Sequence, residues 1–242
     1  MIFFLLACYN EEKAIEPVFR DILSVFGMSG YRIVLVDDGS GDGTAGTADK
    51  MSQELKIPLK ILRHPCNMGL GAALKTGLGW ICKNASGGDF VVTMDCDNTH
   101  PPATAWKMAA KLPGCDAVIA SRFRAGGRQK GVPFLRAAVS RIASRFFRLF
   151  YPAVSDWSSG FRAYRVEVIR ESKIPERIRE KGFISQLEIL LMLLRGKAGI
   201  CEVPLRMDYS LKKSRSKMRF FPLVFSYAKF LFCYLTKHKG QV

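Results

Sequence analysis

The chain has 242 residues, of which 48% are hydrophobic, so it is long and apolar enough to form one large α/β domain with its own core. The formal charge of +16 favours an anionic partner such as nucleic acid, acidic lipid or a phosphorylated substrate, unless it is only a solubility bias. The seven cysteines include no C-x-x-C pair, which argues against a disulfide framework or a zinc site and favours a reducing compartment.

In the amino-terminal stretch MIFFLLACYNEE, residues 1–7 are apolar, and polar residues follow Cys8. A secretory signal needs a basic region followed by roughly 7–15 apolar residues. No Lys or Arg precedes Cys8, and the apolar run is short. We therefore expect this stretch to be a buried strand of a parallel sheet and not a signal peptide.

The first half of the chain alternates between segments typical of strands and of helices. The expected strands lie at 2–7, 31–36, 59–62, 89–94 and 116–120. The expected helices lie at about 12–26, 44–55, 70–84 and 102–112. This alternation predicts a mainly parallel central sheet with helices on both faces. In open sheets of this kind, ligands bind at the carboxyl ends of the strands.

Polar clusters follow three of these strands, at residues 9–11, 37–40 and 95–97. We expect the three clusters to converge on one crevice, because the carboxyl ends of parallel strands lie at one edge of a sheet. Asp95 and Asp97 can together hold a hard divalent cation and the oxygens of a diphosphate. The turn VDDGSGDGT (36–44) can direct carboxylates at a base or ribose, or be an ordinary Asp/Gly turn that caps a helix.

The segment NMGLGAALKTG (67–77) is rich in glycine but does not match a nucleotide-binding loop. Leu74 occupies the third small position of a dinucleotide fingerprint, and no G-K-S/T sequence is present. We expect these glycines to allow close backbone approach at a helix start.

The second half of the chain is basic. Residues 117–155 contain no acidic residue, but they contain eight basic ones: Arg122, Arg124, Arg128, Lys130, Arg136, Arg141, Arg145 and Arg148. The pattern of 134–151 predicts an amphipathic helix with arginines along one face. Such a helix can lie on a membrane surface, or it can pack on the core with a solvated basic face.

The segment FFPLVFSYAKFLFCYL (220–235) is apolar but is interrupted by Pro222 and Lys229. It is shorter than the roughly 20 apolar residues that a spanning helix needs. We expect an amphipathic helix that is interfacial, docks on a partner or packs on the core. Five basic residues before it can bind anionic lipid: Lys212, Lys213, Arg215, Lys217 and Arg219.

Taken in order, the motifs resemble those of the family 2 glycosyltransferases of GT-A fold. Within that family the similarity is greatest to polyprenyl-phosphate hexosyltransferases of the dolichol-phosphate mannosyltransferase type. The resemblance extends from about residue 3 to 219. It is carried by ACYNE (7–11), VDDGSGDGT (36–44), NMGLG (67–71), the D-x-D with HPP (95–102), SRF (121–123), Arg136 with Ser140, D-x-x-S-G-F (156–161) and SK (216–217).

This resemblance implies an inverting hexosyltransferase. It would move a hexose, with mannose from GDP-mannose as the best guess, from a nucleotide-sugar to a polyprenyl or dolichyl phosphate. The implied donor-binding residues are Ala7, Tyr9, Glu11, Val36, Asp38, Asn67, Asp95, Cys96, Asp97 and Lys217. The implied ligands of Mg²⁺ or Mn²⁺ are Asp95, Asp97 and Thr99.

The resemblance also implies that Arg122, Arg136 and Ser140 hold the acceptor phosphate, and that Asp97, Arg122 and Arg136 are the catalytic residues. Helical spacing places Arg136 and Ser140 on one face, away from the other arginines of that helix. The sequence departs from the family pattern at five positions: Ala7 for Pro, Cys96 for Ala, Thr99 for Gln, Leu211 for Arg and Ser214 for Gly.

The predicted catalytic domain covers residues 1–219, and 220–242 form a carboxyl-terminal helix and basic tail. We expect peripheral association with the cytoplasmic face of a membrane, with a membrane-anchored subunit as a candidate partner. Nucleic-acid binding explains the charge but not three acidic clusters at strand ends, so no nucleic-acid partner is expected.

Two alternatives remain open at this point. In one, the enzyme uses a UDP-sugar and a sugar hydroxyl acceptor in cell-wall or polysaccharide synthesis. That acceptor needs a general base, for which Asp156 and Glu188 are candidates. In the other, the protein binds a nucleotide-sugar without catalysis.

Overall fold

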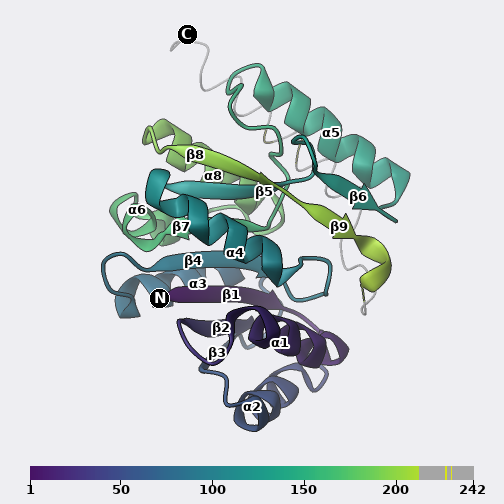
Figure 1. Ribbon diagram of the computed structural model, residues 1–242, viewed down its shortest axis with the longest axis vertical. Helices are drawn as coiled ribbons and strands as arrows, with labels where there is room; N and C mark the ends of the chain where they lie inside the picture. Colours follow the sequence, from purple (N-terminus) through teal and green to yellow (C-terminus); the bar gives the residue numbers. More distant parts are fainter. Residues whose placement is uncertain (213–226, 228–229, 231–242) are drawn as a thin grey trace.

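The computed structural model describes residues 1–212, 227 and 230 (Figure 1). Its central sheet has seven strands in the order β3-β2-β1-β4-β7-β5-β8. The strands are β1 (Ile2–Cys8), β2 (Tyr31–Asp37), β3 (Leu59–Arg63), β4 (Phe90–Asp95), β5 (Ala117–Ser121), β7 (Arg162–Arg165) and β8 (Ile200–Pro204). Only β7 runs antiparallel to its neighbours within this sheet, β4 and β5. The expected mainly parallel sheet is confirmed, and each of the five predicted strands ends one residue later than predicted.

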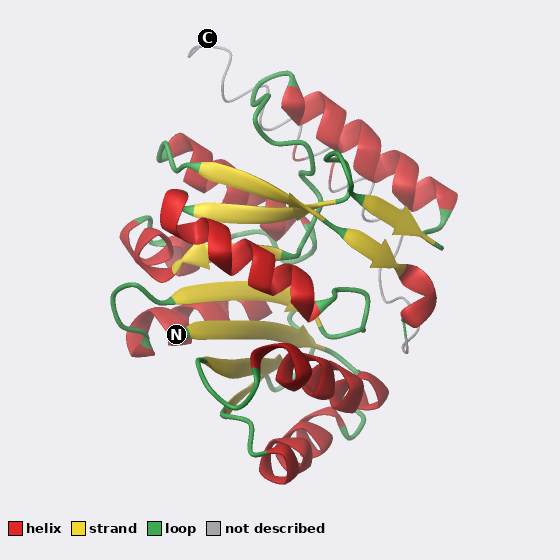
Figure 2. Cartoon of the chain, viewed as in Figure 1, coloured by secondary structure: helices red, strands yellow, loops and turns green. Residues whose placement is uncertain are grey.

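A second, two-stranded sheet pairs β6 (Arg128–Lys130) with β9 (Arg206–Asp208). The helices are α1 (Glu12–Phe26), α2 (Thr44–Leu55), α3 (Leu70–Asn84), α4 (Pro102–Lys111), α5 (Phe134–Arg148), α6 (Val166–Glu171), α7 (Ile174–Arg177) and α8 (Ile184–Arg195). Two short 3-10 turns are η1 (Leu112–Gly114) and η2 (Tyr209–Leu211). Figure 2 shows these helices in red around the yellow strands.

The alternation of side chains along β1 explains why both faces of the sheet are covered. Phe4 and Leu6 point into the cluster formed with α1, α2 and α4, whereas Phe3 and Leu5 point into the cluster formed with α3, α6, α7 and α8. All four are buried. A strand that is buried on both faces has to be apolar throughout. This requirement explains why MIFFLLA is as apolar as the core of a signal sequence, although it is shorter.

The glycines of α3 permit close packing, as the sequence predicted. A Cβ on Gly71 would lie 1.8 Å from the carbonyl oxygen of Glu180, and a Cβ on Gly77 would lie 2.2 Å from Leu5 Cδ1. No ligand is needed to explain either glycine.

Helix α5 packs on the core through one side and exposes the other. Its buried residues Ala143 and Phe147 pack in a third cluster with Trp157 and α8, and Tyr227 completes that cluster. Its opposite side exposes Phe134 (83%) and Ile142 (68%). The three arginines of the predicted stripe, Arg141, Arg145 and Arg148, are also exposed. Apart from Tyr227 and Phe230, the predicted carboxyl-terminal helix lies outside the described residues.

No helix within residues 1–212 has both the length and the apolarity needed to cross a membrane.

We predict that Gly77→Ala lowers the free energy of unfolding by about 1–3 kcal/mol, because the added methyl group overpacks against Leu5. Gly79→Ala is the matched control in the same helix, because its nearest neighbour is Pro175 Cβ at an ordinary 3.8 Å. The control should be neutral or stabilising by up to about 1 kcal/mol. Urea denaturation measures both, and equal stability of the two variants would contradict the packing argument.

Candidate active site

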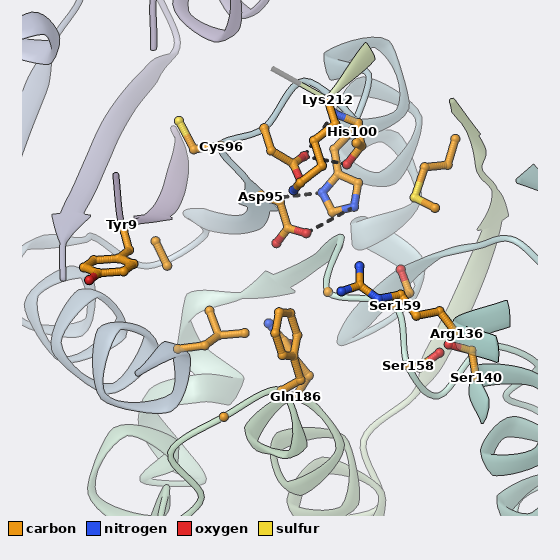
Figure 3. A pocket seen from close by; sticks show the side chains of 18 of the residues that line it. Tyr9, Asp95, Cys96, His100, Arg136, Ser140, Ser158, Ser159, Gln186 and Lys212 are labelled. Atoms are coloured by element: carbon orange, nitrogen blue, oxygen red, sulfur yellow. Dashed lines mark hydrogen bonds and ion pairs between the residues drawn. The ribbon is translucent and has the colours of Figure 1, made fainter. Parts of the chain in front are cut away.

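One cavity of about 380 Å³ opens at the carboxyl ends of β1 and β4 (Figure 3). The loops after these two strands, the segment 158–160 and the first turn of α8 contribute to its wall. Residues of α5 and of η2 line it as well. The acidic clusters at 9–11 and 95–97, and Asp38 of the third, therefore converge on one cavity, as the topology predicted.

Most of the predicted donor-binding residues line this cavity: Ala7, Tyr9, Glu11, Asp38, Asn67, Asp95, Cys96 and Asp97. Val36 does not line it. It is fully buried in the core, with its Cγ2 facing the Cα of Gly77, because side chains alternate along β2 and Val36 points to the face covered by α3. The Val36 side chain is therefore directed away from the cavity, and a contact of Val36 with a nucleoside stays a prediction that only its backbone could fulfil. Lys217 lies outside the described residues.

Asp38 organises the loop that forms one wall of the cavity. Its Oδ1 accepts hydrogen bonds from the backbone N–H of Met68 (2.9 Å), and its Oδ2 accepts one from Gly69 (2.8 Å). His64 Nδ1 lies 2.6 Å from the same Oδ1, and His64 Nε2 lies 2.9 Å from Thr76 Oγ1. His64 thus links β3, the 67–69 loop and α3, a role that its place at a strand end did not reveal.

Asp97 is held by two neighbours. Its Oδ1 accepts the backbone N–H (3.1 Å) and the hydroxyl (2.6 Å) of Thr99, and its Oδ2 accepts a hydrogen bond from Lys212 Nζ. Burial acts to raise the pKa of Asp97, but His100, Lys212 and these hydrogen bonds outweigh it and lower that pKa. Thr99, predicted as a metal ligand, has its hydroxyl directed at Asp97 and so orients that carboxylate.

His100 shapes the turn beside the D-x-D pair. Its Nδ1 lies 3.0 Å from the backbone nitrogen of Asp95 and accepts that N–H, and its Nε2 lies 3.9 Å from Asp95 Oδ2. The ring stacks on Phe161 with centroids 4.6 Å apart. His100 is therefore a buried support for the backbone and the carboxylate of Asp95, as expected.

The residues around Asp95 and Asp97 fit a hard divalent cation. Within residues 1–212, His, Cys, Asp and Glu form no group of three that could hold a metal ion. Mg²⁺ and Mn²⁺ are commonly held by one or two carboxylates together with substrate phosphates and water, and the cavity offers two carboxylates. The ammonium of Lys212 on Asp97 Oδ2 shows that this position accepts a cation.

Two arginines, Arg122 and Arg136, also line the cavity. Arg122 Nε and NH2 donate to Asp156 Oδ2 and Oδ1, each at 2.8 Å, and NH2 also donates to Ser158 Oγ at 2.7 Å. Arg136 NH1 donates to the hydroxyl of Tyr209 at 2.6 Å. Arg136 and Ser140 both line the cavity, so the prediction that they share an inward face of α5 is confirmed (Figure 3).

The two candidate bases are engaged elsewhere. Asp156 is fully buried; burial acts to raise its pKa, but the Arg122 guanidinium outweighs this and lowers it. Glu188 accepts the backbone N–H groups of Arg179 and Glu180 and does not line the cavity. Burial raises the pKa of Glu188. The structure therefore assigns Asp156 to holding Arg122 and Glu188 to holding the 179–180 loop.

The cavity residues that the sequence did not identify as site residues include Ser158, Gln186, Tyr209 and Lys212. From the sequence, Lys212 is expected to bind anionic lipid. Gln186 had a usable signal, because it is the one amide in the apolar sequence ISQLEILLML of α8.

Comparison with known proteins matches residues 4–172 to the model of Glycosyl transferase family 2. The chain is 33% identical over 239 residues to the dolichol-phosphate mannosyltransferase of Pyrococcus furiosus, covering 97% of this chain and 63% of that protein. It is 30% identical to the polyprenol monophosphomannose synthase of Mycolicibacterium smegmatis, covering 72% of this chain and 65% of that protein. The chain thus spans about two thirds of the length of these relatives.

Among solved structures, the glucosyl-3-phosphoglycerate synthase of Mycobacterium tuberculosis has a TM-score of 0.69 with 20% identity. The match covers 99% of this chain and 80% of that one, which was crystallised with Mn²⁺, UDP and glucosyl-3-phosphoglycerate. The similarity confirms the GT-A fold that the motifs implied.

We predict that Asp156→Asn lowers the free energy of unfolding by about 3–5 kcal/mol near neutral pH, because it leaves the buried Arg122 charge without a partner. The folded-state pKa of Asp156 is lowered, so its contribution is complete above the unfolded pKa of about 3.9 and is lost as pH falls below it. The difference between wild type and variant should shrink in that acid range.

Glu54→Gln is the control, because Glu54 forms an exposed pair with Lys50 and such a pair contributes about 1 kcal/mol or less. Denaturant unfolding at several pH values measures both variants. If Asp156→Asn lowers the free energy of unfolding no more than Glu54→Gln does, the buried pair does not stabilise this side of the cavity.

Proposed function

Since the chain belongs to Glycosyl transferase family 2, we propose that it transfers a hexose from a nucleotide diphosphate sugar to a polyprenyl phosphate, with inversion at the anomeric carbon. GDP-mannose is the proposed donor. The names of the two relatives, a dolichol-phosphate mannosyltransferase and a polyprenol monophosphomannose synthase, support this choice of sugar and acceptor.

The observation that carries the proposal is the division of charge within one cavity. Asp95 and Asp97 line the cavity together with Arg122 and Arg136. A cation bound to the carboxylates suits a donor diphosphate, whereas arginines suit an acceptor phosphate, which they hold by charge-assisted hydrogen bonds. Two anionic groups can therefore be held in the same cavity.

The placement of the candidate bases supports a phosphate acceptor over a sugar hydroxyl. A hydroxyl must lose its proton during attack, but Asp156 is paired with Arg122 and Glu188 lies outside the cavity wall. A phosphate is already anionic near neutral pH and needs only orientation. The intact Asp95 and Asp97 weigh against the non-catalytic alternative.

In the proposed reaction, an acceptor phosphate oxygen forms a bond to the anomeric carbon. The bond from that carbon to the donor diphosphate oxygen breaks on the opposite face, and its electron pair leaves with the nucleoside diphosphate. Arg122, Arg136 and Ser140 hold the attacking phosphate, and Asp95 and Asp97 hold the cation. When bound, Mg²⁺ or Mn²⁺ supplies a Lewis acid for the leaving diphosphate. Lys212 and Lys217 add positive charge there.

We also propose that the enzyme works at the cytoplasmic face of a membrane, and the exposed side of α5 supports contact with a bilayer. Phe134, Ile142 and Leu149 are 83%, 68% and 79% exposed, and Arg141 and Arg145 are exposed beside them. Apolar and basic side chains on one helix are the combination that binds anionic bilayers. The inward side of the same helix carries Arg136 and Ser140, so a lipid-bound phosphate can reach the cavity from this surface. A membrane-anchored partner subunit and an interfacial 220–242 helix stay predictions.

The test is transfer of radiolabelled sugar from GDP-mannose, UDP-glucose or UDP-N-acetylglucosamine to polyprenyl phosphate, followed by organic extraction. We expect label in the lipid phase from one donor, and loss of at least 100-fold with chelator or with Asp97→Asn, which removes a carboxylate at the cation position. Asp49→Asn, on α2 away from the cavity, should retain full activity. Absence of transfer from every donor would refute the proposed reaction.

A second prediction concerns the membrane. The double variant Ile142→Glu/Leu149→Glu should bind vesicles of anionic phospholipid at least tenfold more weakly than wild type, because two apolar side chains lose about 1.5–3 kcal/mol each on leaving the bilayer. Met28→Glu is the control, since Met28 is equally apolar and is exposed on another part of the surface. Flotation assays measure binding, and unchanged binding of the double variant would exclude this side of α5 as the contact.

A further inference from the structure

Gln186 is a buried amide in the cavity wall whose side-chain oxygen has no partner. Only 4% of the residue is exposed, and Oε1 makes no hydrogen bond to any described residue. Leaving such an acceptor unsatisfied costs about 1–3 kcal/mol. Buried polar groups without partners are rare, and those that line a cavity are candidates for contact with a ligand.

The amide faces the D-x-D carboxylate across a glycine. A Cβ placed on Gly160 would lie 3.6 Å from Gln186 Nε2 and 3.7 Å from Asp95 Oδ1. Gly160 has no side chain to fill the space that these two groups share. Figure 3 shows Gln186 pointing into the cavity from the wall opposite Asp95. The small space is therefore bordered by the uncharged amide of Gln186 on one side and by the carboxylate of Asp95 on the other.

A buried arginine holds Gln186 in this position. Arg162 is fully buried, and it donates through NH1 to the backbone carbonyl of Gln186 and through NH2 to that of Trp157 at 2.9 Å. The hydroxyl of Ser185 donates to the carbonyl of Gly182 at 2.7 Å and closes the turn before the helix. The first turn of α8 is therefore tied to the segment that carries Gly160.

We propose that Gln186 and the open space above Gly160 form the hexose-binding subsite of the cavity, in which the amide, whose Nε2 faces this space, forms a hydrogen bond with a sugar hydroxyl. The inference rests on the proposed function and names the residue that selects the sugar. A phosphate does not suit this space, because Gln186 offers it no positive charge. A polyhydroxylated neutral ring suits it, because each hydroxyl both donates and accepts.

The subsite should discriminate between sugars by one hydroxyl. A site whose buried polar group pairs with a substrate hydroxyl rejects an analogue that lacks the hydroxyl, because the group is then left unpaired. An amide cannot act as a general base, so Gln186 binds the sugar and does not activate the acceptor. Gln186 thus acts as a specificity-determining residue.

The test measures binding of the sugar-nucleotide and of the nucleotide alone by calorimetry, and transfer from the donor and from its monodeoxy analogues. For Gln186→Leu we expect affinity for GDP within twofold of wild type, and kcat/KM for GDP-mannose lower by about 10–100-fold. One monodeoxy donor, poor with wild type, should be used by the variant nearly as well as the complete donor. Gln53→Leu, an exposed amide on α2, is the control and should match wild type.

Gly160→Ala provides a second variant that should fold, because the added Cβ meets only ordinary contacts at 3.6 Å and beyond. It should also lower transfer without changing affinity for GDP. Two results would overturn the inference. In the first, Gln186→Leu lowers the affinity for GDP as much as the affinity for GDP-mannose. In the second, it lowers the rate of transfer equally for every deoxy donor. If no acceptor is glycosylated at all, the proposed reaction fails, but the difference in affinity between sugar-nucleotide and nucleotide still decides the role of Gln186.

Discussion

The side of the cavity that carries the proposed acceptor-binding arginines depends on one buried ion pair, between Arg122 and Asp156. The carboxylate is fully buried, and burying a charge without a partner costs several kcal/mol. The backbone N–H of Arg122 and two groups of its guanidinium bind it, and so do the backbone N–H groups of Ser158 and Ser159. This single carboxylate therefore fixes the end of β5 against the segment that leads to Gly160.

The same pair explains how a basic surface and an acidic crevice coexist in one protein. The cavity takes its arginines from the end of β5 and from α5 and its carboxylates from the ends of β1 and β4, and Lys212 pairs with Asp97. Each set of side chains is thus complementary to a different part of the proposed reaction. The carboxylates suit a cation and, through it, a diphosphate, and the arginines suit a second anion.

The sequence was sufficient for the sheet and for the convergence of the acidic clusters, because both follow from the period of the apolar residues and from parallel topology. Individual side-chain directions were harder to predict. Val36 and Asp38 are two residues apart, yet Val36 lies in the core and Asp38 lines the cavity, because β2 ends at Asp37 and the alternation of the strand ends with it. Gln186 was overlooked in favour of Glu188, because the sequence does not show that Glu188 binds backbone N–H groups.

The turn η2 connects Asp97 with Arg136. Lys212 Nζ binds Asp97 and lies 5.5 Å from the ring centroid of Tyr209, whose hydroxyl accepts a hydrogen bond from Arg136. A cation bound at Asp97 would repel the Lys212 ammonium. Movement of Lys212 would then shift η2, which contacts Arg136 through Tyr209. Leu211, where the family pattern has an arginine, is exposed, so the positive charge at the D-x-D pair comes from the next residue. The positive charge that the family pattern places at position 211 is thus supplied by Lys212, and Asp97 keeps a cationic partner.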